Sequence, residues 1–172
     1  LDSELTAEGL AQAEAAGLLL KELSIQALYC SSIPRALKSA ELVAKHLGLE
    51  PLPCAQLWEC GWGDWEGHIW QDLKERFPDL MEQREKNLME FRVPGGESYR
   101  DVENRVMPFL EQLRQVHDGQ PIAIMGHGMV NRIMLRKLLG WTVEQMREIR
   151  QGNGQIIHLQ QSEGKYNLRI LG

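Results

Sequence analysis

The chain has 172 residues, of which 43% are hydrophobic and 25% are charged. This length and composition fit one globular domain over residues 1–172, because chains divide into several domains mainly above roughly 250 residues. The formal net charge of −5 argues against a broad nucleic-acid surface, so no nucleic-acid partner is expected. The longest apolar runs fall far short of the ~20 residues of a membrane helix, and no membrane association is expected.

The three cysteines are Cys30, Cys54 and Cys60, an odd number without a C-x-x-C spacing. They predict neither a disulfide framework nor a zinc site, and no other group of His, Cys and Asp residues has metal-ligand spacing. A reducing cytoplasm is the compartment that this usage favours. We therefore expect a cytoplasmic protein without a metal.

Helical and extended patterns alternate along the chain, which is typical of an α/β domain with a mostly parallel sheet flanked by helices. In chain order, the predicted elements are a helix at 6–23, a strand at 27–30, a helix at 33–47, an extended piece at 51–54, helices at 68–77 and 79–90, a long helix from 98 through 113, a strand at 121–126, a helix at 128–139, a short helix at 143–149 and strands at 155–160 and 166–171.

Several of these elements carry more specific expectations. Thr6 and Ser98 are predicted N-caps of their helices. The Gly- and Trp-rich stretch LWECGWGDWEGH is expected to be a structured loop, and the charged helices after it to form a lid over one face of the sheet. The apolar run PIAIMG predicts a strand covered on both faces, and the last two strands an edge hairpin.

Arg35 and His127 follow two different predicted strands, and ligands of open α/β sheets bind where strands end. Arg35 lies in the first turn of a helix, where both the guanidinium and the free N–H groups favour an anion. A guanidinium binds a phosphoryl group in a bidentate manner. Gly126 and Gly128 flank His127 and are expected to allow unusual backbone angles and close approach of a ligand.

Glu59 lies among Trp58, Trp62 and Trp65 in the Gly- and Trp-rich stretch. Apolar surroundings disfavour the charged form of a carboxyl group and suit a general acid that protonates a leaving alkoxide. Taken one at a time, an arginine, a histidine or a glutamate is more often a solvated or hydrogen-bonded structural residue. The other four histidines and the five tryptophans are interpreted in that structural way.

The sequence segments that contain Arg35, Glu59 and His127 favour a functional role for these three residues. Six segments resemble the phosphoglycerate mutase-like family of the histidine phosphatase superfamily, in its order and approximate spacing and over essentially the whole chain. These segments are LDSELTAEGLAQA, YCSSIPRALKSAELVA, LWECGWGDWEG, PGGES, IAIMGHGMVNRIML and RQGNGQIIHL. The stretch WGDWEGH is closer to the small phosphatase branch, which includes α-ribazole phosphatase-like members, than to the longer mutases.

The resemblance implies a three-layer fold and places the family's site residues on this sequence. The second phosphate-binding arginine falls on Arg35, the proton donor on Glu59 and the second active-site histidine on His127, with Gly128 beside the phosphate. The implied activity is hydrolysis of a small phosphorylated metabolite through a phosphohistidine intermediate, without cofactor or metal. The sequence leaves open the identity of the metabolite and whether the chain forms a homodimer.

The chain departs from the family pattern in one respect, since it lacks the family's N-terminal Arg-His-Gly motif. That motif supplies the nucleophilic histidine and a phosphate-binding arginine at the end of the first strand, and no such tripeptide occurs in this chain. Because the chain also opens on Leu1 and not on methionine, we expect the nucleophile and the first strand upstream of Leu1. Without that strand, the sheet should contain a polar-lined slot and expose apolar faces.

Two alternatives stay open at this point. A phosphoglycerate mutase would return the phosphoryl group to a bound hydroxy acid and not to water. A protein that begins near Leu1 would keep Arg35 and His127 as an anion pocket without a nucleophile, and would be a catalytically inactive phosphate-binding protein.

Overall fold

The computed structural model describes residues 3–172, so Leu1 and Asp2 lie outside the described residues. The helices are α1 (Ala7–Lys21), α2 (Pro34–Leu47), α3 (Trp70–Arg76), α4 (Pro78–Lys86), α5 (Tyr99–Val116), α6 (Gly128–Leu139) and α7 (Val143–Glu148), with the short 3₁₀ turns η1 (Ala55–Leu57) and η2 (Gly63–Trp65). The strands are β1 (Ala27–Ser31), β2 (Pro51–Cys54), β3 (Ile122–Met125), β4 (Ile156–Ser162) and β5 (Lys165–Leu171).

The predicted helix caps are confirmed. The Thr6 hydroxyl accepts a hydrogen bond from the Gly9 amide, and Ser98 and Asp101 form a reciprocal capping box at the start of α5. Gly48 closes α2 in the left-handed conformation, with φ of 67°. Helices α1 and α4 end earlier than predicted, since their last predicted residues form turns, and α3 ends at Arg76, one residue early.

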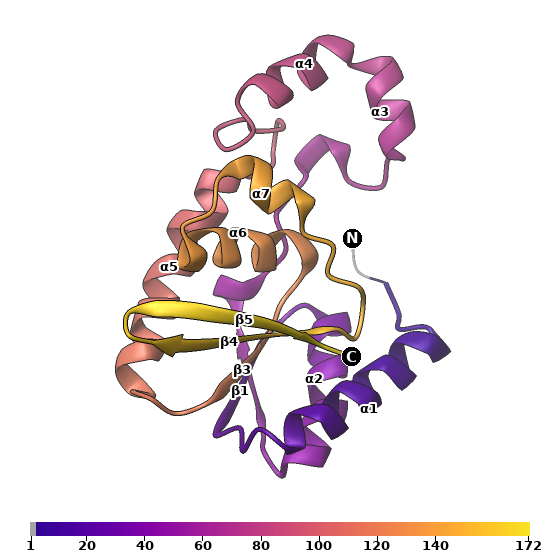
Figure 1. Ribbon diagram of the computed structural model, residues 1–172. Helices are drawn as coiled ribbons and strands as arrows, with labels where there is room; N and C mark the ends of the chain where they lie inside the picture. The colour runs from indigo at the N-terminus through magenta and orange to yellow at the C-terminus, as the bar shows by residue number, and fades with distance from the viewer. Residues whose placement is uncertain (1–2) are drawn as a thin grey trace.

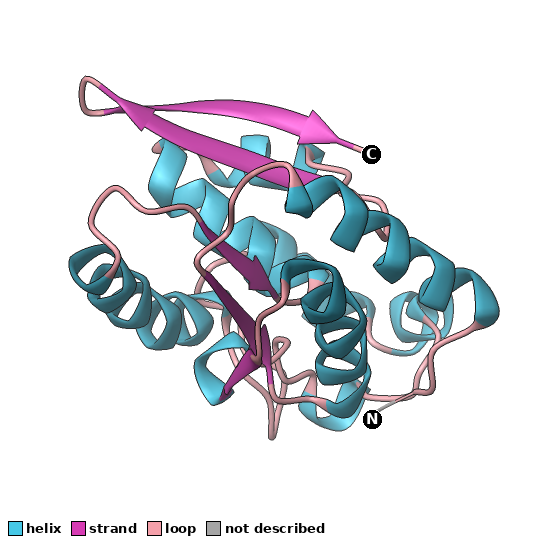
Figure 2. Ribbon diagram, turned by 90° about the horizontal axis from the view of Figure 1, so that it is seen from below, coloured by secondary structure: helices cyan, strands magenta, loops and turns pink. Residues whose placement is uncertain are grey.

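The three-stranded sheet has the order β2-β1-β3, and both pairings are parallel. Figure 2 shows this sheet at the centre of the molecule with helices around it, so the predicted α/β class is confirmed. One core cluster joins α1, α2 and β1, and a larger one joins α5 and α6. No helix within residues 3–172 is long and apolar enough to cross a membrane.

The C-terminal hairpin is the first correction. β4 and β5 pair antiparallel around a tight turn in which Glu163 and Gly164 have φ of 50° and 77°. Among the described residues, however, this hairpin forms its own two-stranded sheet and is not hydrogen-bonded to the edge of the parallel sheet. In Figures 1 and 2 it forms an outer layer. Residues of β3 and β4 line one cavity.

The burial of β3 is the second correction. A strand covered on both faces was predicted, but Ala123 is the one buried residue of β3, at 9% exposure. The reason is a cavity of about 1780 Å³ that Ile122–Met125 line together with residues of α1, α6 and β4. Within residues 3–172, β3 pairs with β1 alone, so its other edge faces this cavity. A cavity with both polar and apolar lining residues therefore lies beside β3.

Candidate active site

Arg35 and His127 meet at the carboxyl edge of the parallel sheet. Arg35 follows β1 in the first turn of α2, where Pro34 occupies the first helical position. His127 follows β3 and is the N-cap of α6. Because β1 and β3 are parallel neighbours, the two side chains come together, and Arg35 Nη2 lies 3.4 Å from His127 Nδ1. Both side chains line the large cavity.

The hydrogen bonds of the His127 ring define its orientation. A guanidinium can only donate, so the contact from Arg35 requires an unprotonated Nδ1. The proton of the neutral ring is then on Nε2, which donates to Ser31 Oγ at 2.9 Å. Ser31 is fully buried at the end of β1 and also accepts from the Ile33 amide. Ser31 was not predicted as a site residue, since a serine after a strand carries no distinctive signal.

The two glycines beside His127 lack the unusual backbone angles that were predicted. Neither has a φ in the left-handed region. A Cβ on Gly126 would lie 2.6 Å from Asn131 Oδ1, so the glycine is explained by crowding from α6. A Cβ on Gly128 would meet nothing within 4 Å, and Gly128 lines the cavity. Gly128 thus leaves room for a ligand beside His127, whereas Gly126 allows the helix to approach the strand.

Glu59 lies at the same edge, but its surroundings differ from the prediction. Its carboxylate accepts main-chain hydrogen bonds from Cys60 at 2.9 Å and from Met129 and Val130 at 3.2 Å each. The expected apolar environment is wrong, because the rings of Trp62 and Trp65 pack elsewhere, against other aromatic rings. The first turn of α6 therefore holds the Glu59 carboxylate and presents His127 at its cap.

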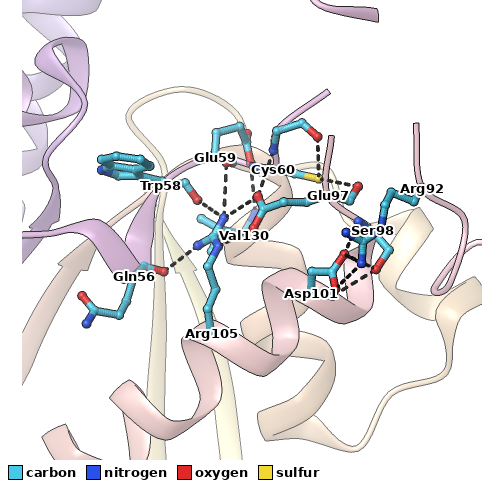
Figure 3. Close-up of polar contacts among 11 residues, drawn as sticks. Gln56, Trp58, Glu59, Cys60, Arg92, Glu97, Ser98, Asp101, Arg105 and Val130 are labelled. Carbon is cyan, nitrogen blue, oxygen red and sulfur yellow. Dashed lines mark hydrogen bonds and ion pairs between the residues drawn. The ribbon is translucent and has the colours of Figure 1, made fainter. Parts of the chain in front are cut away.

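Arg105 is a site residue that the sequence did not reveal. Its guanidinium donates to the main-chain carbonyls of Gln56 and Trp58 at 2.7 and 2.8 Å, and to that of Glu59 at 3.3 Å. Figure 3 shows the Arg105 side chain rising from α5 to this loop. Glu97, in the PGGES motif, binds Arg105 and accepts from the Gly61 amide at 3.0 Å. The sequence feature that could have indicated this residue is its position, two helical turns after the Ser98 cap.

The charge of Glu97 suits this position. Burial raises the pKa of its carboxyl, but the hydrogen bonds from Arg105 and the Gly61 amide lower it, and the net shift is downward. An ionised Glu97 holds Arg105, and Arg105 holds the main chain on both sides of Trp58. The described part of the chain holds no group of three or more His, Cys, Asp and Glu residues that could bind a metal ion.

The cluster thus combines a guanidinium, an imidazole and a carboxylate in the lining of a cavity, at the edge where parallel-sheet proteins bind ligands. When an oxyanion takes the place of their mutual contact, the guanidinium and a doubly protonated imidazole can both donate hydrogen bonds to it, the ring through Nδ1. The carboxyl group can exchange a proton with a leaving or attacking oxygen. Of the predicted site residues, the structure brings Arg35, Glu59, His127 and Gly128 together around one cavity.

The chain is similar in sequence to known enzymes. Phosphoserine phosphatase 1 of Hydrogenobacter thermophilus is 32% identical over 145 residues, which is 81% of this chain and 66% of that protein, so the chain spans just under two thirds of that relative. A 2,3-bisphosphoglycerate-dependent phosphoglycerate mutase of a Methylobacterium species is 33% identical over 150 residues, 83% of this chain and 72% of that protein.

The fold comparison agrees. The α-ribazole phosphatase from Shigella flexneri superposes with a TM-score of 0.84 and 26% identity, covering 99% of this chain and 85% of that one. The sequence profile of the histidine phosphatase superfamily (branch 1) matches residues 1–172. With Arg35, Glu59 and His127 at one edge of the sheet, the chain belongs to the histidine phosphatase superfamily, branch 1.

Proposed function

We propose that the protein hydrolyses a small phosphate monoester through a phosphohistidine intermediate. The observation that carries the proposal is the 3.4 Å contact between Arg35 and His127 in the lining of the cavity, with the Glu59 carboxylate bound to the first-turn amides of α6. An arginine and a histidine so placed suit a phosphoryl group, whose transfer depends mainly on positioning and on electrostatic stabilisation of its oxygens.

The nucleophile in this proposal is a histidine on a strand that occupies the large cavity, supplied by polypeptide outside residues 1–172. Two observations support it. The cavity of about 1780 Å³ is much larger than a small phosphate ester requires, and apolar residues of β3, α1 and α6 line it. The free edge of β3 faces the cavity and would pair with an added strand.

The reaction then has two balanced steps. The nitrogen of the nucleophilic histidine forms a bond to phosphorus as the bond to the ester oxygen breaks, and Glu59 gives its proton to the departing alkoxide. Water then attacks the phosphohistidine, returns a proton to Glu59 and releases inorganic phosphate. Arg35 and His127 hold the phosphoryl oxygens in both steps, and Gly128 leaves the space that the group occupies.

The test is to trap the intermediate in the natural full-length protein. During turnover of p-nitrophenyl phosphate, rapid quenching and intact mass measurement should show one added phosphoryl group that is stable in alkali and lost in acid, as phosphohistidine is. Arg35→Gln should lower the yield of this species, whereas Arg114→Gln, an exposed arginine on α5, should not. Phosphate binding without turnover or phosphorylation would reject the proposal in favour of a non-catalytic phosphate-binding protein.

A phosphoglycerate mutase is the second candidate, and the 33% identity to the Methylobacterium mutase favours it. Such an enzyme would transfer the phosphoryl group from the histidine back to a hydroxy acid. Conversion of 3-phosphoglycerate to 2-phosphoglycerate faster than release of inorganic phosphate would identify a mutase. The reverse ratio would identify a phosphatase.

A further inference from the structure

Residues 151–155, which lie between α7 and β4, form one wall of the large cavity. All five of them line this cavity, as do Gly126, His127 and Asn131. We call these five residues the 151–155 loop. None of them takes part in the chemistry proposed above, although they share the cavity with Arg35 and His127.

The 151–155 loop is closed on itself by hydrogen bonds. Gln155 Oε1 accepts from the Gly152 amide at 2.8 Å, and the Gln155 amide donates to the Gly152 carbonyl at 3.2 Å. Gly154 has a φ of 80°, and a Cβ at this position would lie 3.0 Å from Gln12 Cβ of α1. The loop is thus a small ordered unit that packs against α1.

Asn131 connects the 151–155 loop to the start of α6. Its Nδ2 group donates to Gln151 Oε1 at 3.1 Å, and Gln151 Nε2 donates in turn to the Gln155 carbonyl at 3.0 Å. The main-chain amide of Asn131 donates to the His127 carbonyl at 2.9 Å. A chain of hydrogen bonds therefore runs from the loop through Asn131 to His127.

The Asn131 side chain also packs against the residue that precedes His127. Its Oδ1 atom lies 2.6 Å from the position that a Cβ on Gly126 would take. Gly126 thus leaves the space beside the end of β3 to the Asn131 carboxamide. Asn131 meets the main chain on both sides of His127, at Gly126 and at the His127 carbonyl.

The Asn131 carboxamide has a cost in stability. Its Oδ1 atom is buried and has no hydrogen-bond partner among residues 3–172. An unpaired buried acceptor destabilises a fold, and a leucine of about the same shape would fill this space without that cost. Packing alone therefore does not explain an asparagine here, whereas its bond to Gln151 does.

We infer that Asn131 is a positioning residue for His127, which acts by holding the start of α6 against the 151–155 loop through Gln151. This inference rests on the proposed function, in which His127 holds the phosphoryl oxygens. Ser31 and Arg35 orient the His127 ring, whereas Asn131 acts on its main chain.

Asn131→Leu in the natural full-length protein separates positioning from stability. It removes the bond to Gln151 and the unpaired acceptor together, and it keeps the approximate size of the side chain. We expect Tm to stay at or above the wild-type value, while kcat/KM for p-nitrophenyl phosphate falls about fivefold or more. The inhibition constant of inorganic phosphate, which measures binding of the phosphoryl group alone, should rise by a similar factor.

Gln151→Leu removes the other partner of the bond and should have the same effects. The double variant should lose little beyond either single variant, because the same chain of hydrogen bonds is broken in all three. Asn167→Leu is the matched control, since it makes the same substitution at an exposed position of β5. It should leave both the turnover of p-nitrophenyl phosphate and the inhibition by phosphate unchanged.

The outcomes separate this inference from the proposed function. Wild-type turnover and phosphate inhibition in Asn131→Leu would overturn the inference, as would a loss of activity that parallels a fall in Tm. Additive losses in the double variant would also overturn it, since Asn131 and Gln151 would then act separately. If the wild type hydrolyses no ester, the proposed function fails, and calorimetry with inorganic phosphate tests Asn131 alone. Weaker binding in Asn131→Leu would then support the positioning role, and equal binding would reject it.

Discussion

Glu97 and Arg105 form a two-point ion pair, in which Arg105 Nε and Nη2 lie 2.8 and 3.1 Å from the two carboxylate oxygens. The same guanidinium donates to the carbonyls of Gln56, Trp58 and Glu59. The main chain of Glu59 is thus fixed from α5, and its carboxylate from the first turn of α6. Within residues 3–172, the hydrogen bonds of Arg105 reach Glu97 and the main chain of residues 56–59 and neither Arg35 nor His127, so Arg105 is a positioning residue for Glu59.

Replacement of Arg105 by glutamine should therefore impair proton donation more than phosphate binding. We expect Arg105→Gln to lower kcat for an alkyl phosphate about tenfold or more, because the carbonyls of residues 56–59 lose their shared donor. Turnover of p-nitrophenyl phosphate, whose leaving group needs little protonation, should fall much less. Steady-state kinetics on both substrates measures the difference.

The matched control is Arg114→Gln, on the same helix, whose side chain is 52% exposed and which should leave both rates unchanged. An equal loss on both substrates in Arg105→Gln, accompanied by a lower Tm, would assign Arg105 a structural role only.

The lowered pKa of Glu97 predicts a dependence of stability on pH. A carboxyl whose folded pKa lies below its unfolded value of 4.5 stabilises the fold above that value, and the contribution is lost as the pH falls through the folded pKa. Glu97→Gln should therefore lower the free energy of unfolding by about 1 kcal/mol or more at pH 7. The deficit should shrink as the pH falls below 4.5.

Urea unfolding of wild type and Glu97→Gln at neutral and acid pH measures this change. Glu111→Gln is the control, because its side chain is 59% exposed and its ion pair with Arg114 contributes little. A deficit that is constant with pH would show that Glu97 acts through packing and not through its charge.

Local signals made most of the fold predictable from the sequence. The capping pairs at Thr6 and Ser98, and the left-handed Gly48, depend on a few neighbouring residues, and their elements begin or end where predicted. The burial of β3 and the pairing of the hairpin depend instead on what lies beside them in space. For that reason the apolar run PIAIMG predicts a strand that is covered on both faces, although the structure has a cavity beside it.

Some residues of the candidate site could likewise be predicted from the sequence, and others could not. Arg35 and His127 are recognisable because each follows a strand, and parallel strands end at one edge of a sheet. Arg105 and Ser31 are not recognisable, because their partners lie 46 and 96 residues away in the chain. The environment of Glu59 was misjudged for a related reason, since its neighbours in sequence are tryptophans but its contacts include amides of α6.

Ser31 is expected to orient the His127 ring. Ser31→Ala removes the acceptor of the Nε2 proton and leaves the ring held by its Arg35 contact on the other side. We expect KM and kcat to worsen together, with kcat/KM for p-nitrophenyl phosphate falling about tenfold, since one hydrogen bond at a buried group is removed. Ser32→Ala, whose hydroxyl accepts from the exposed Trp58 ring, is the control and should stay near wild type.

Glu59 provides the sharpest test of the proposed chemistry. General acid catalysis contributes about 10²–10⁴-fold when the leaving group is a poor one. Glu59→Gln keeps the size of the side chain and an oxygen that can accept from Val130 or Met129, but it has no acidic proton to give. We therefore expect turnover of an alkyl phosphate to fall at least about 100-fold and that of p-nitrophenyl phosphate only a few-fold.

A series of phenyl and alkyl phosphates with leaving groups of increasing basicity measures the effect. The rate of Glu59→Gln should depend much more steeply on leaving-group basicity than that of wild type. Because Arg105 acts through Glu59, the double variant with Arg105→Gln should lose little beyond Glu59→Gln alone. Parallel slopes for wild type and Glu59→Gln would mean that the proton comes from another group, and Glu59 would then be a ligand of the α6 amides only.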